Sequence, residues 1–290
     1  MIFLYLCFLS VAHADLAHAD LTVTQFGLVS VADTIRSFYE FAVTERSGTL
    51  VFNQSEADLG WTSPQFINPQ YWNTAFISAS ADIKLVGNQK YYRIMLNGGA
   101  LRRPGFTRDE TALIACHELG HLIGGEPTKL TNGGGISVII DGEDDSGFRY
   151  RTSVEGQSDY WAASRCLKQY FSVQNNAAWE TGLNSPRNQQ AAALCEKNYV
   201  TRVEQLICER SIESALRFAY DEWAYSKERK SGIPAPQVNT PDSVVVEQTR
   251  ISHPSPQCRL DTFVAGALCK ECNSDLNVTM GPRPSCWYHP

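Results

Sequence analysis

The most regular pattern of apolar and polar positions lies between residues 107 and 123. Charged residues fill its first turn, and aliphatic residues then flank a short polar run on both sides. Thr107 and Glu110 have the spacing of a capping box, in which each side chain accepts a backbone N–H of the other residue. Gly124 and Gly125 follow as a stop signal. The pattern predicts a largely buried helix over 107–123.

A second helix is predicted over 154–171, where Ala, Leu, Gln and Lys favour helical structure and Ser153 can act as the N-cap. Glu155 and Asp159 lie four residues apart and therefore share one face of this helix. The same face continues with small side chains and is expected to pack inward, at Ala162 and Cys166. Two carboxylates on an inward face require compensating partners.

Alternating positions predict two strands, over 75–86 and 91–96, and Gly87-Asn88 between them predicts a hairpin. Gly98-Gly99 after the second strand could form a simple turn. The other expected elements are an N-terminal helical or strand-helix segment, a loop-rich stretch and two later helices, over 21–45, 50–75, 187–196 and 201–227.

The run His117-Glu118-Leu119-Gly120-His121 falls inside the first predicted helix. Two histidines four residues apart project from one face of a helix, where one tetrahedral zinc ion can take both imidazoles. Glu118 between them can accept a proton from a zinc-bound water. The alternative is an amphipathic helix with two polar residues on one stripe, but the apolar flanks favour buried imidazoles, which need partners.

A catalytic zinc ion usually has three protein ligands and one open position. A third histidine of the metzincin type is excluded, because Pro127 stands six residues after His121. The downstream histidines, His253 and His289, lie far along the chain in a Cys- and Pro-rich tail. We therefore expect Glu155 to complete a site with two histidines and one glutamate.

Asp159 is expected to accept the N–H of a zinc-bound histidine and so to fix its tautomer. The alternative leaves Glu155 and Asp159 as solvated helix acids. Competing carboxylates lie at the end of the first helix and in a turn-rich acidic run, namely Glu126, Asp141, Glu143, Asp144 and Asp145. The acidic run lacks the full EF-hand spacing, and a calcium site there stays an open alternative.

HELGH combined with Glu155-x-x-x-Asp159 resembles the gluzincin metallopeptidases, and within them the soluble catalytic domains of the CAAX-protease/HtpX type. The similarity covers about residues 90–171, with a Gly-Gly strand, an HExxH helix and an ExxxD helix. It implies that the strand over 91–96 borders the cleft, where its free edge could bind an extended peptide as a further strand. It does not extend to membrane-spanning helices or to the tail after 230, and so implies no substrate class. The resemblance implies a zincin-like fold with zinc ligands, a general base and a partner of one ligand, at His117, His121, Glu155, Glu118 and Asp159.

Residues 1–14 are expected to form a cleaved signal peptide. Ile2–Val11 is an apolar run of ten residues, which is too short to span a bilayer. Ala12-His13-Ala14 has the small-x-small form of a signal-peptidase site, and Ala17-His18-Ala19 offers a second one. No Lys or Arg precedes the apolar run, so a buried N-terminal helix is the alternative. We expect an exported product, periplasmic or secreted, without an integral membrane segment.

Cysteine usage agrees with export. Nine cysteines less Cys7 in the signal leave eight, an even set that predicts disulfides in an oxidising compartment. Cys269-x-x-Cys272 could instead belong to a four-cysteine zinc knot. Cys116 and Cys166 fall within the two predicted active-site helices, so either could be a buried free thiol. The other cysteines, whose pairing the sequence leaves open, are Cys195, Cys208, Cys258 and Cys286.

Composition fits a globular protein that does not bind nucleic acid. The net charge of −6 arises from 25 Lys and Arg against 31 Asp and Glu, with no basic block. A hydrophobic content of 43% supports an ordinary core. The expected fold class is α+β. It comprises a mainly helical zincin-like domain with a small β-sheet over 15–230, a linker or long loop over 231–250 and a disulfide-rich C-terminal lobe over 251–290.

The sequence therefore predicts an exported zinc metalloendopeptidase with one catalytic Zn²⁺, which acts on a peptide or protein substrate. Glu118 would take a proton from the attacking water and give it to the leaving amine. A non-catalytic zinc-fold binding module and a zinc hydrolase with a non-peptide substrate are the alternatives. The oxyanion-stabilising group stays open between four candidates, Arg149, Tyr150, Tyr160 and Arg165.

Overall fold

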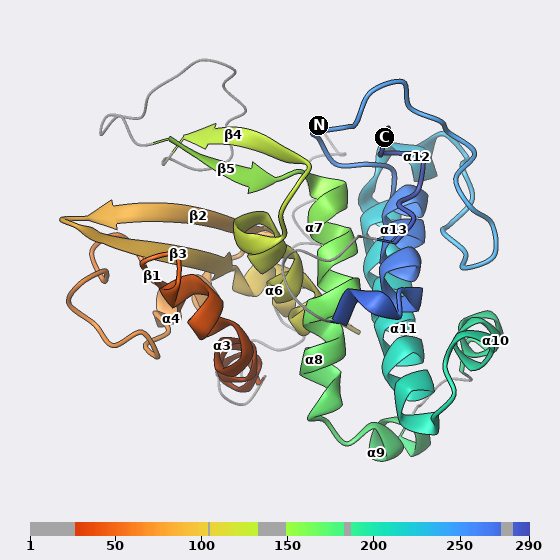
Figure 1. Ribbon diagram of the computed structural model, residues 1–290, viewed down its shortest axis with the longest axis horizontal. Helices are drawn as coiled ribbons and strands as arrows, with labels where there is room; N and C mark the ends of the chain where they lie inside the picture. Colours follow the sequence, from red (N-terminus) through yellow and green to blue (C-terminus); the bar gives the residue numbers. More distant parts are fainter. Residues whose placement is uncertain (1–26, 104, 133–148, 183–186, 274–280) are drawn as a thin grey trace, which may run out of the picture. The chain divides into compact units, whose positions relative to one another are not determined.

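The computed structural model describes residues 27–103, 105–132, 149–182, 187–273 and 281–290. These residues form an α+β protein in which helices predominate and the sheets are small (Figure 1). The expected signal peptide and the acidic run considered for calcium lie outside the described residues. The chain divides into two compact units, one of residues up to Glu118 with Leu130–Arg151, the other of Leu119–Lys129 with Thr152–Pro290.

The first unit contains a three-stranded sheet with the strand order β1-β3-β2 (Figure 1). β2 (Ala79–Val86) and β3 (Gln89–Leu96) form the predicted antiparallel hairpin, with Gly87 in its turn at a φ of 59° that suits glycine. β1 (Gly48–Phe52) pairs with β3 in parallel. The prediction of a free edge on β3 is therefore wrong, because β3 is the central strand. The sequence concealed β1 because a short, buried strand shows no alternation.

Helices of the first unit pack beside this sheet. α3 (Leu28–Thr44) contacts β1 and buries a stripe with helical spacing that consists of Leu28, Val31, Ile35, Tyr39 and Val43. α4 (Pro69–Asn73) and α5 (Gly98–Leu101) are short. Gly98-Gly99 begins α5, and a Cβ on Gly98 would lie 1.8 Å from the carbonyl oxygen of Trp72. Close backbone approach, rather than a turn, therefore accounts for this glycine.

α6 (Arg108–Ile123) confirms the helix predicted over 107–123. The backbone N–H of Thr107 donates to Glu110 Oε2 at 2.8 Å, and the N–H of Glu110 donates to Thr107 Oγ1 at 3.4 Å. These contacts form the expected capping box. The division between the units falls inside this continuous helix, after Glu118. Two strands absent from the prediction, β4 (Thr128–Asn132) and β5 (Arg149–Ser153), form a two-stranded sheet.

The helix predicted over 154–171 consists of three consecutive segments in the second unit. α7 (Glu155–Trp161) continues into a π-helical segment (Ala162–Cys166) and then into α8 (Leu167–Ser172). The expected Ser153 N-cap is wrong, because Val154 occupies the N-cap position. The Ser153 hydroxyl instead donates to the carbonyl oxygen of Gly125 at 2.7 Å.

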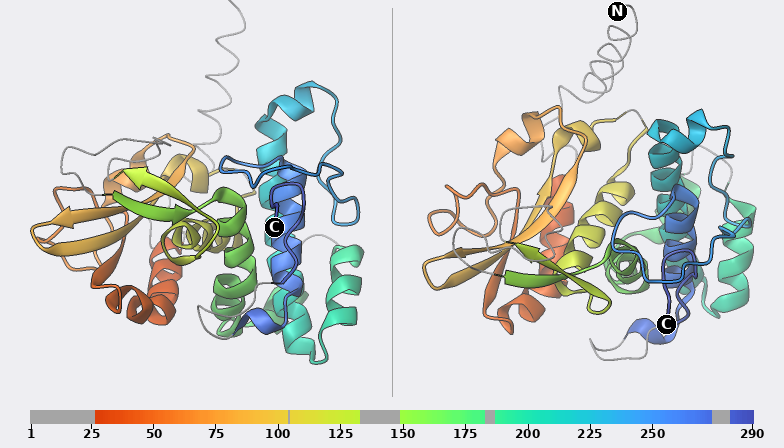
Figure 2. Two further views of the ribbon diagram at one scale, coloured as in Figure 1. Left: turned by 45° about the horizontal axis from the view of Figure 1, so that its top comes forward. Right: turned by 90° about the horizontal axis from the view of Figure 1, so that it is seen from above.

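The remaining helices of the second unit are α9 (Asn176–Thr181), α10 (Gln189–Asn198), α11 (Arg202–Tyr225), α12 (Lys227–Lys230) and α13 (Pro256–Leu268), and Glu271–Asn273 forms a 3-10 turn. α11 and α13 lie side by side (Figure 2), and α13 also packs against α7. A Cβ on Gly266 would lie 2.6 Å from the carbonyl oxygen of Tyr160, so this contact between helices is close. The C-terminal tail therefore supplies a helix to the core of this unit.

Disulfides account for the cysteines of the described residues. Bonds join Cys195 to Cys208, Cys258 to Cys286 and Cys269 to Cys272. The alternative of a four-cysteine zinc knot is therefore wrong. Cys116 and Cys166 are also disulfide-bonded, which contradicts the expectation of a buried free thiol. All eight cysteines that follow the expected signal peptide are disulfide-bonded, which is compatible with the expected export. Among the described residues, no helix combines the length and apolar character that a membrane span requires.

Candidate metal centre

The structure brings the three predicted ligands together. His117 and His121 project from α6, and Glu155 is the first residue of α7. One possible ligand atom from each residue lies within 4.8 Å of those from the other two. His117 and Glu155 are buried, and His121 is partly buried. A pair of imidazoles and one carboxylate therefore converge in a region that is largely shielded from solvent.

The middle of the HELGH run allows α7 to approach the C-terminal turns of α6. A Cβ on Gly120 would lie 3.0 Å from both the Cα and the carbonyl oxygen of Ser158. Two hydrogen bonds of the second unit secure the same approach, because Gln157 Nε2 donates to the Gly124 carbonyl at 2.8 Å and Ser153 donates to Gly125. The lack of a side chain at Gly120 and these two hydrogen bonds therefore set the distance between the backbones of α6 and α7.

The imidazole of His121 has a defined orientation. Its Nδ1 lies 2.8 Å from the carbonyl oxygen of Ser153. Since a carbonyl oxygen only accepts, we assign the proton of the neutral ring to Nδ1. Nε2 then carries a lone pair and lies 3.3 Å from Glu155 Oε2. Such a backbone partner orients a metal-binding histidine.

The two oxygens of Glu155 have different surroundings. Oε1 accepts a hydrogen bond from Lys129 Nζ at 2.9 Å. Oε2 lies 3.3 Å from His121 Nε2 and 3.2 Å from His253 Nε2. The position of His253 far along the chain gave no indication that it would lie near Glu155. Its only signal was that histidine is scarce, with six in the chain.

Distances within this group fit a shared ion better than direct hydrogen bonds. A tetrahedral zinc ion holds nitrogen and oxygen ligands about 3.3–3.5 Å apart. Charge-assisted N–H···O bonds are shorter, about 2.7–2.9 Å. The 3.3 Å separation of His121 Nε2 from Glu155 Oε2 lies in the first range, whereas the 2.9 Å contact of Lys129 matches the second. His253 lies outside the group whose donor atoms are all within 4.8 Å of one another. Imidazole nitrogen and carboxylate oxygen are ligands that zinc accepts, so the residues fit this ion.

Asp159, which lies one turn after Glu155, forms a buried ion pair with Arg259 that the sequence did not predict. Arg259 Nε and Nη2 donate to its two carboxylate oxygens at 2.8 and 2.7 Å. Arg259 Nη1 also donates to Glu222 Oε2 at 2.9 Å. Burial alone would lower the pKa of Arg259, but Asp159 and Glu222 outweigh it and raise that pKa above its usual value. The hydrogen bond from a zinc-bound histidine to Asp159 stays a prediction, and the His121 ring is oriented by the Ser153 carbonyl.

The proposed base and two oxyanion candidates can be placed. Glu118 follows His117 directly on α6 and is buried. Tyr160 faces the Cys269–Cys272 disulfide, with its hydroxyl 3.7 Å from Cys272 Sγ, and burial raises its pKa. The Tyr150 hydroxyl accepts a hydrogen bond from the backbone N–H of Ile83 at 3.0 Å. These contacts lend no support to either tyrosine as the oxyanion-stabilising group.

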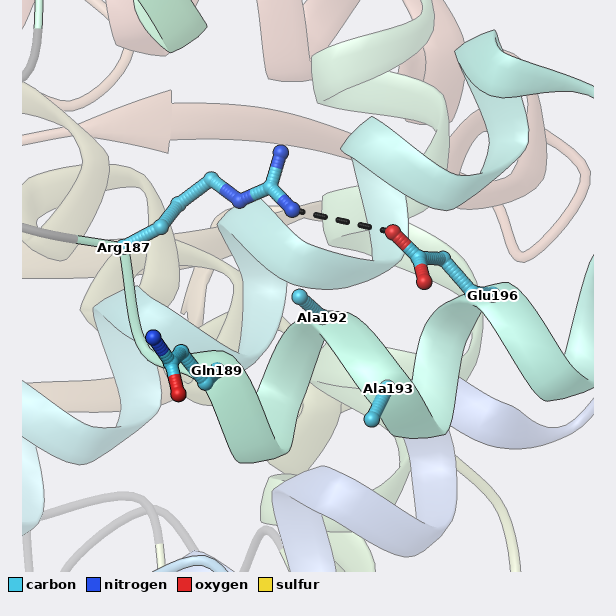
Figure 3. A pocket seen from close by; sticks show the side chains of 5 residues that line it. All are labelled: Arg187, Gln189, Ala192, Ala193 and Glu196. Carbon is cyan, nitrogen blue, oxygen red and sulfur yellow. Dashed lines mark ion pairs between the residues drawn. The ribbon is translucent and has the colours of Figure 1, made fainter.

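The second unit also has a hollow formed by other residues. It has a volume of about 380 Å³, and its lining consists of Arg187, Gln189, Ala192, Ala193 and Glu196 (Figure 3). Arg187 Nη2 lies 3.6 Å from Glu196 Oε1 across it. Its charged side chains therefore pair with each other, and it contains none of the predicted ligands.

Comparison with known proteins identified no relative of this chain. No protein-family model, curated protein or solved structure matches the chain. The chemistry of the centre therefore follows from its own residues and distances.

Proposed function

We propose that this protein is an exported zinc metallopeptidase. The observation that carries the proposal is the convergence of donor atoms from His117, His121 and Glu155, with Glu118 between the two histidines on the same helix. The donor set suits zinc, and three protein ligands leave the open position that a catalytic zinc site needs. The disulfides support an oxidising compartment, in keeping with export.

Each residue has a distinct role in the proposed reaction. The ion, when bound, polarises the scissile carbonyl and lowers the pKa of the attacking water. His117, His121 and Glu155 would hold it, Ser153 orients the His121 ring, and the hydrogen bond from Lys129 fixes the Glu155 carboxylate. Glu118 takes the proton of the attacking water and delivers it to the leaving amine.

A zinc-fold binding module is the second candidate, and one observation favours it. His253 Nε2 lies 3.2 Å from Glu155 Oε2, and structural zinc sites are commonly closed by four protein ligands. A structural site has no use for a base, however, and Glu118 has the position of one. This residue therefore separates the two candidates.

Replacement of Glu118 by glutamine tests the proposed function. We expect Glu118→Gln to retain about one zinc ion per chain and to lose cleavage of a mixed peptide library by about 10²- to 10⁴-fold, the usual contribution of a general base. Mass spectrometry would measure both the metal and the products, in the natural chain and in a His253→Ala background.

Glu247→Gln is the matched control, because Glu247 is an exposed glutamate outside the metal centre. It should keep both zinc and activity. Unchanged cleavage by Glu118→Gln would remove the base assignment. Cleavage by neither natural chain nor His253→Ala chain, with zinc bound, would favour the binding module.

A further inference from the structure

We propose that Lys129 is a positioning residue of the metal centre, which leaves Glu155 a single oxygen with which to bind the ion. This inference rests on the proposed function and deepens it, because the way in which Glu155 binds decides how many positions around the ion stay open. A carboxylate that binds through one oxygen occupies one position, and one that binds through both occupies two. Beside His117 and His121, the first case leaves an open position in a tetrahedral site.

The backbone brings Lys129 to the start of α7. The N–H of Val154, the residue before Glu155, donates to the carbonyl oxygen of Pro127 at 3.0 Å. Lys129 follows Pro127 by two residues and belongs to β4. This hydrogen bond therefore joins the segment that carries the ammonium group to the segment that carries the carboxylate, close to both side chains.

The two oxygens of Glu155 are directed to different partners. Lys129 Nζ donates to Oε1 at 2.9 Å, which is the length of a charge-assisted hydrogen bond. Oε2 lies 3.3 Å from Nε2 of His121, a separation that fits two ligands of one tetrahedral ion. An ammonium group has no lone pair and cannot bind a metal, so it competes with the ion for Oε1. The oxygen that stays available to the ion is Oε2.

Burial makes this ammonium group effective. The side chain of Lys129 is 14% exposed and that of Glu155 is 6% exposed. Charges interact more strongly in such surroundings than they do in water. Among the described residues, Glu155 is the only carboxylate that forms an ion pair with Lys129, whose other contact is the neutral carbonyl oxygen of Ile251 at 3.5 Å. No second described anion therefore draws the ammonium group away from Oε1.

The charge of Lys129 has a further consequence for metal affinity. It compensates the charge of Glu155 in the metal-free chain, and it repels a divalent cation that binds at Oε2. Removal of this charge should therefore tighten zinc binding. If Lys129 only supported the local structure, its loss would weaken zinc binding. The direction of the change separates the positioning role from a structural one.

Zinc titrations of the full chain against a chromophoric chelator measure this direction. We expect Lys129→Met to lower the Kd for zinc by about tenfold or more, as follows from loss of a charge close to the ion in a largely buried site. Lys129→Arg, which keeps the charge, should retain the natural Kd. Lys84→Met is the matched control, because Lys84 forms an ion pair of 2.8 Å with Glu56 outside the metal centre. A Kd that rises or stays unchanged in Lys129→Met would overturn the inference.

Cobalt substitution tests the number of coordinating oxygens without any measurement of activity. Four-coordinate cobalt(II) absorbs visible light more strongly than five-coordinate cobalt(II). We expect the stronger absorption in the natural chain and in Lys129→Arg. The weaker absorption is expected in Lys129→Met, because both oxygens of Glu155 can then bind. Circular dichroism checks the fold of each variant, and Lys129→Gln is the second neutral variant. Equal cobalt spectra in the natural chain and both neutral variants would overturn the single-oxygen role.

The outcomes separate this inference from the proposed function. Equal zinc affinity and equal cobalt spectra in the natural chain and Lys129→Met, with cleavage that depends on Glu118, would overturn the role of Lys129 and leave the peptidase intact. Tighter zinc binding and a weaker cobalt spectrum in Lys129→Met, without cleavage by the natural chain, would support the role of Lys129 and overturn the peptidase. A chain that binds no zinc would overturn both.

Discussion

Two groups of side chains in the second unit each surround a buried glutamate, and they differ in the kind of partner. The Glu155 cluster consists of His121, Lys129, Glu155 and His253. The Glu209 cluster consists of Glu180, Arg187, Glu196, Arg202 and Glu209. In the second cluster, Arg202 Nη1 donates to Glu209 Oε1 at 2.9 Å and Arg187 Nε lies 3.2 Å from Glu209 Oε2. Guanidinium groups, which cannot bind a metal, supply all of the described cations there.

The difference shows that donor chemistry, rather than empty volume, marks the candidate site. The hollow of about 380 Å³ lies beside the Glu209 cluster, whose charges already compensate each other. The Glu155 cluster instead directs imidazole nitrogens toward one carboxylate oxygen. Imidazole can be neutral and can offer a lone pair, so this arrangement has a capacity for ligation that paired guanidinium groups lack.

Removal of Arg259 should give the largest change in stability. Asp159 and Arg259 resemble the pairs of the Glu209 cluster in chemistry but are both buried, and breaking a buried pair costs about 3–5 kcal/mol. We expect Arg259→Met to lower the free energy of unfolding by that amount in urea titrations. Arg202→Met, at a residue that is 39% exposed, should cost about 1 kcal/mol or less.

The double variant Asp159→Asn with Arg259→Met provides a check on this prediction. It should recover part of the loss, because no uncompensated buried charge then remains. A change of about 1 kcal/mol or less in the single Arg259 variant would place this pair in the same energetic class as the Glu209 cluster and contradict the prediction.

Replacement of the central glutamate should weaken zinc binding in the Glu155 cluster and leave it unchanged in the Glu209 cluster. We expect Glu155→Gln to raise the Kd for zinc by about 100-fold or more, since even residues behind a ligand contribute about 10- to 100-fold. Competition with a chromophoric chelator measures this. Glu209→Gln, an equivalent change in a buried glutamate of the other cluster, should leave the Kd unchanged. Normal zinc affinity in Glu155→Gln would show that the third ligand lies elsewhere.

The smallest effect is expected from Glu209→Gln on stability. At pH 7 the free energy of unfolding should change by about 1 kcal/mol or less, because Arg187 and Arg202 are 30% and 39% exposed and can be hydrated again. Burial raises the pKa of Glu209 above 4.5, despite both arginines. The native state then binds this proton more tightly than the unfolded state does.

The same pKa shift gives the sign of the pH dependence. The natural chain should gain stability relative to Glu209→Gln as the pH falls from neutral through the raised pKa toward 4.5. Urea titrations of both proteins across this range measure the gap between them. A natural chain that loses stability relative to the variant on acidification would contradict the direction of the shift.

Local signals in the sequence predicted the parts of the centre that depend on one helix. The capping box at Thr107 and the spacing of His117 and His121 follow from helical geometry, and α6 confirms the helix. The hairpin of β2 and β3 follows from alternation around a turn. The placement of Glu155 near the histidines was predicted because its helix needed compensation for buried acids.

Long-range partners could not be predicted from the same signals. Arg259 reaches Asp159 across 100 residues of sequence, and the His253–Glu155 contact depends equally on tertiary packing. A local signal for α13 did exist, because Ser255 and Pro256 are favourable N-cap and N1 residues, but the cysteines of the tail obscured it. The π-helical segment of 162–166 carries no sequence signature that separates it from α-helix.

Gly120 gives the HELGH run a requirement that its generic form does not express. A Cβ at this position would come within 3.0 Å of the Ser158 backbone, so the residue before the second histidine acts as a spacer between two helices. Related chains that share this centre should therefore be sought with the pattern His-Glu-x-Gly-His rather than with two unrestricted positions. An otherwise matching chain with a bulky residue there would have to bind its ion with wider helix separation.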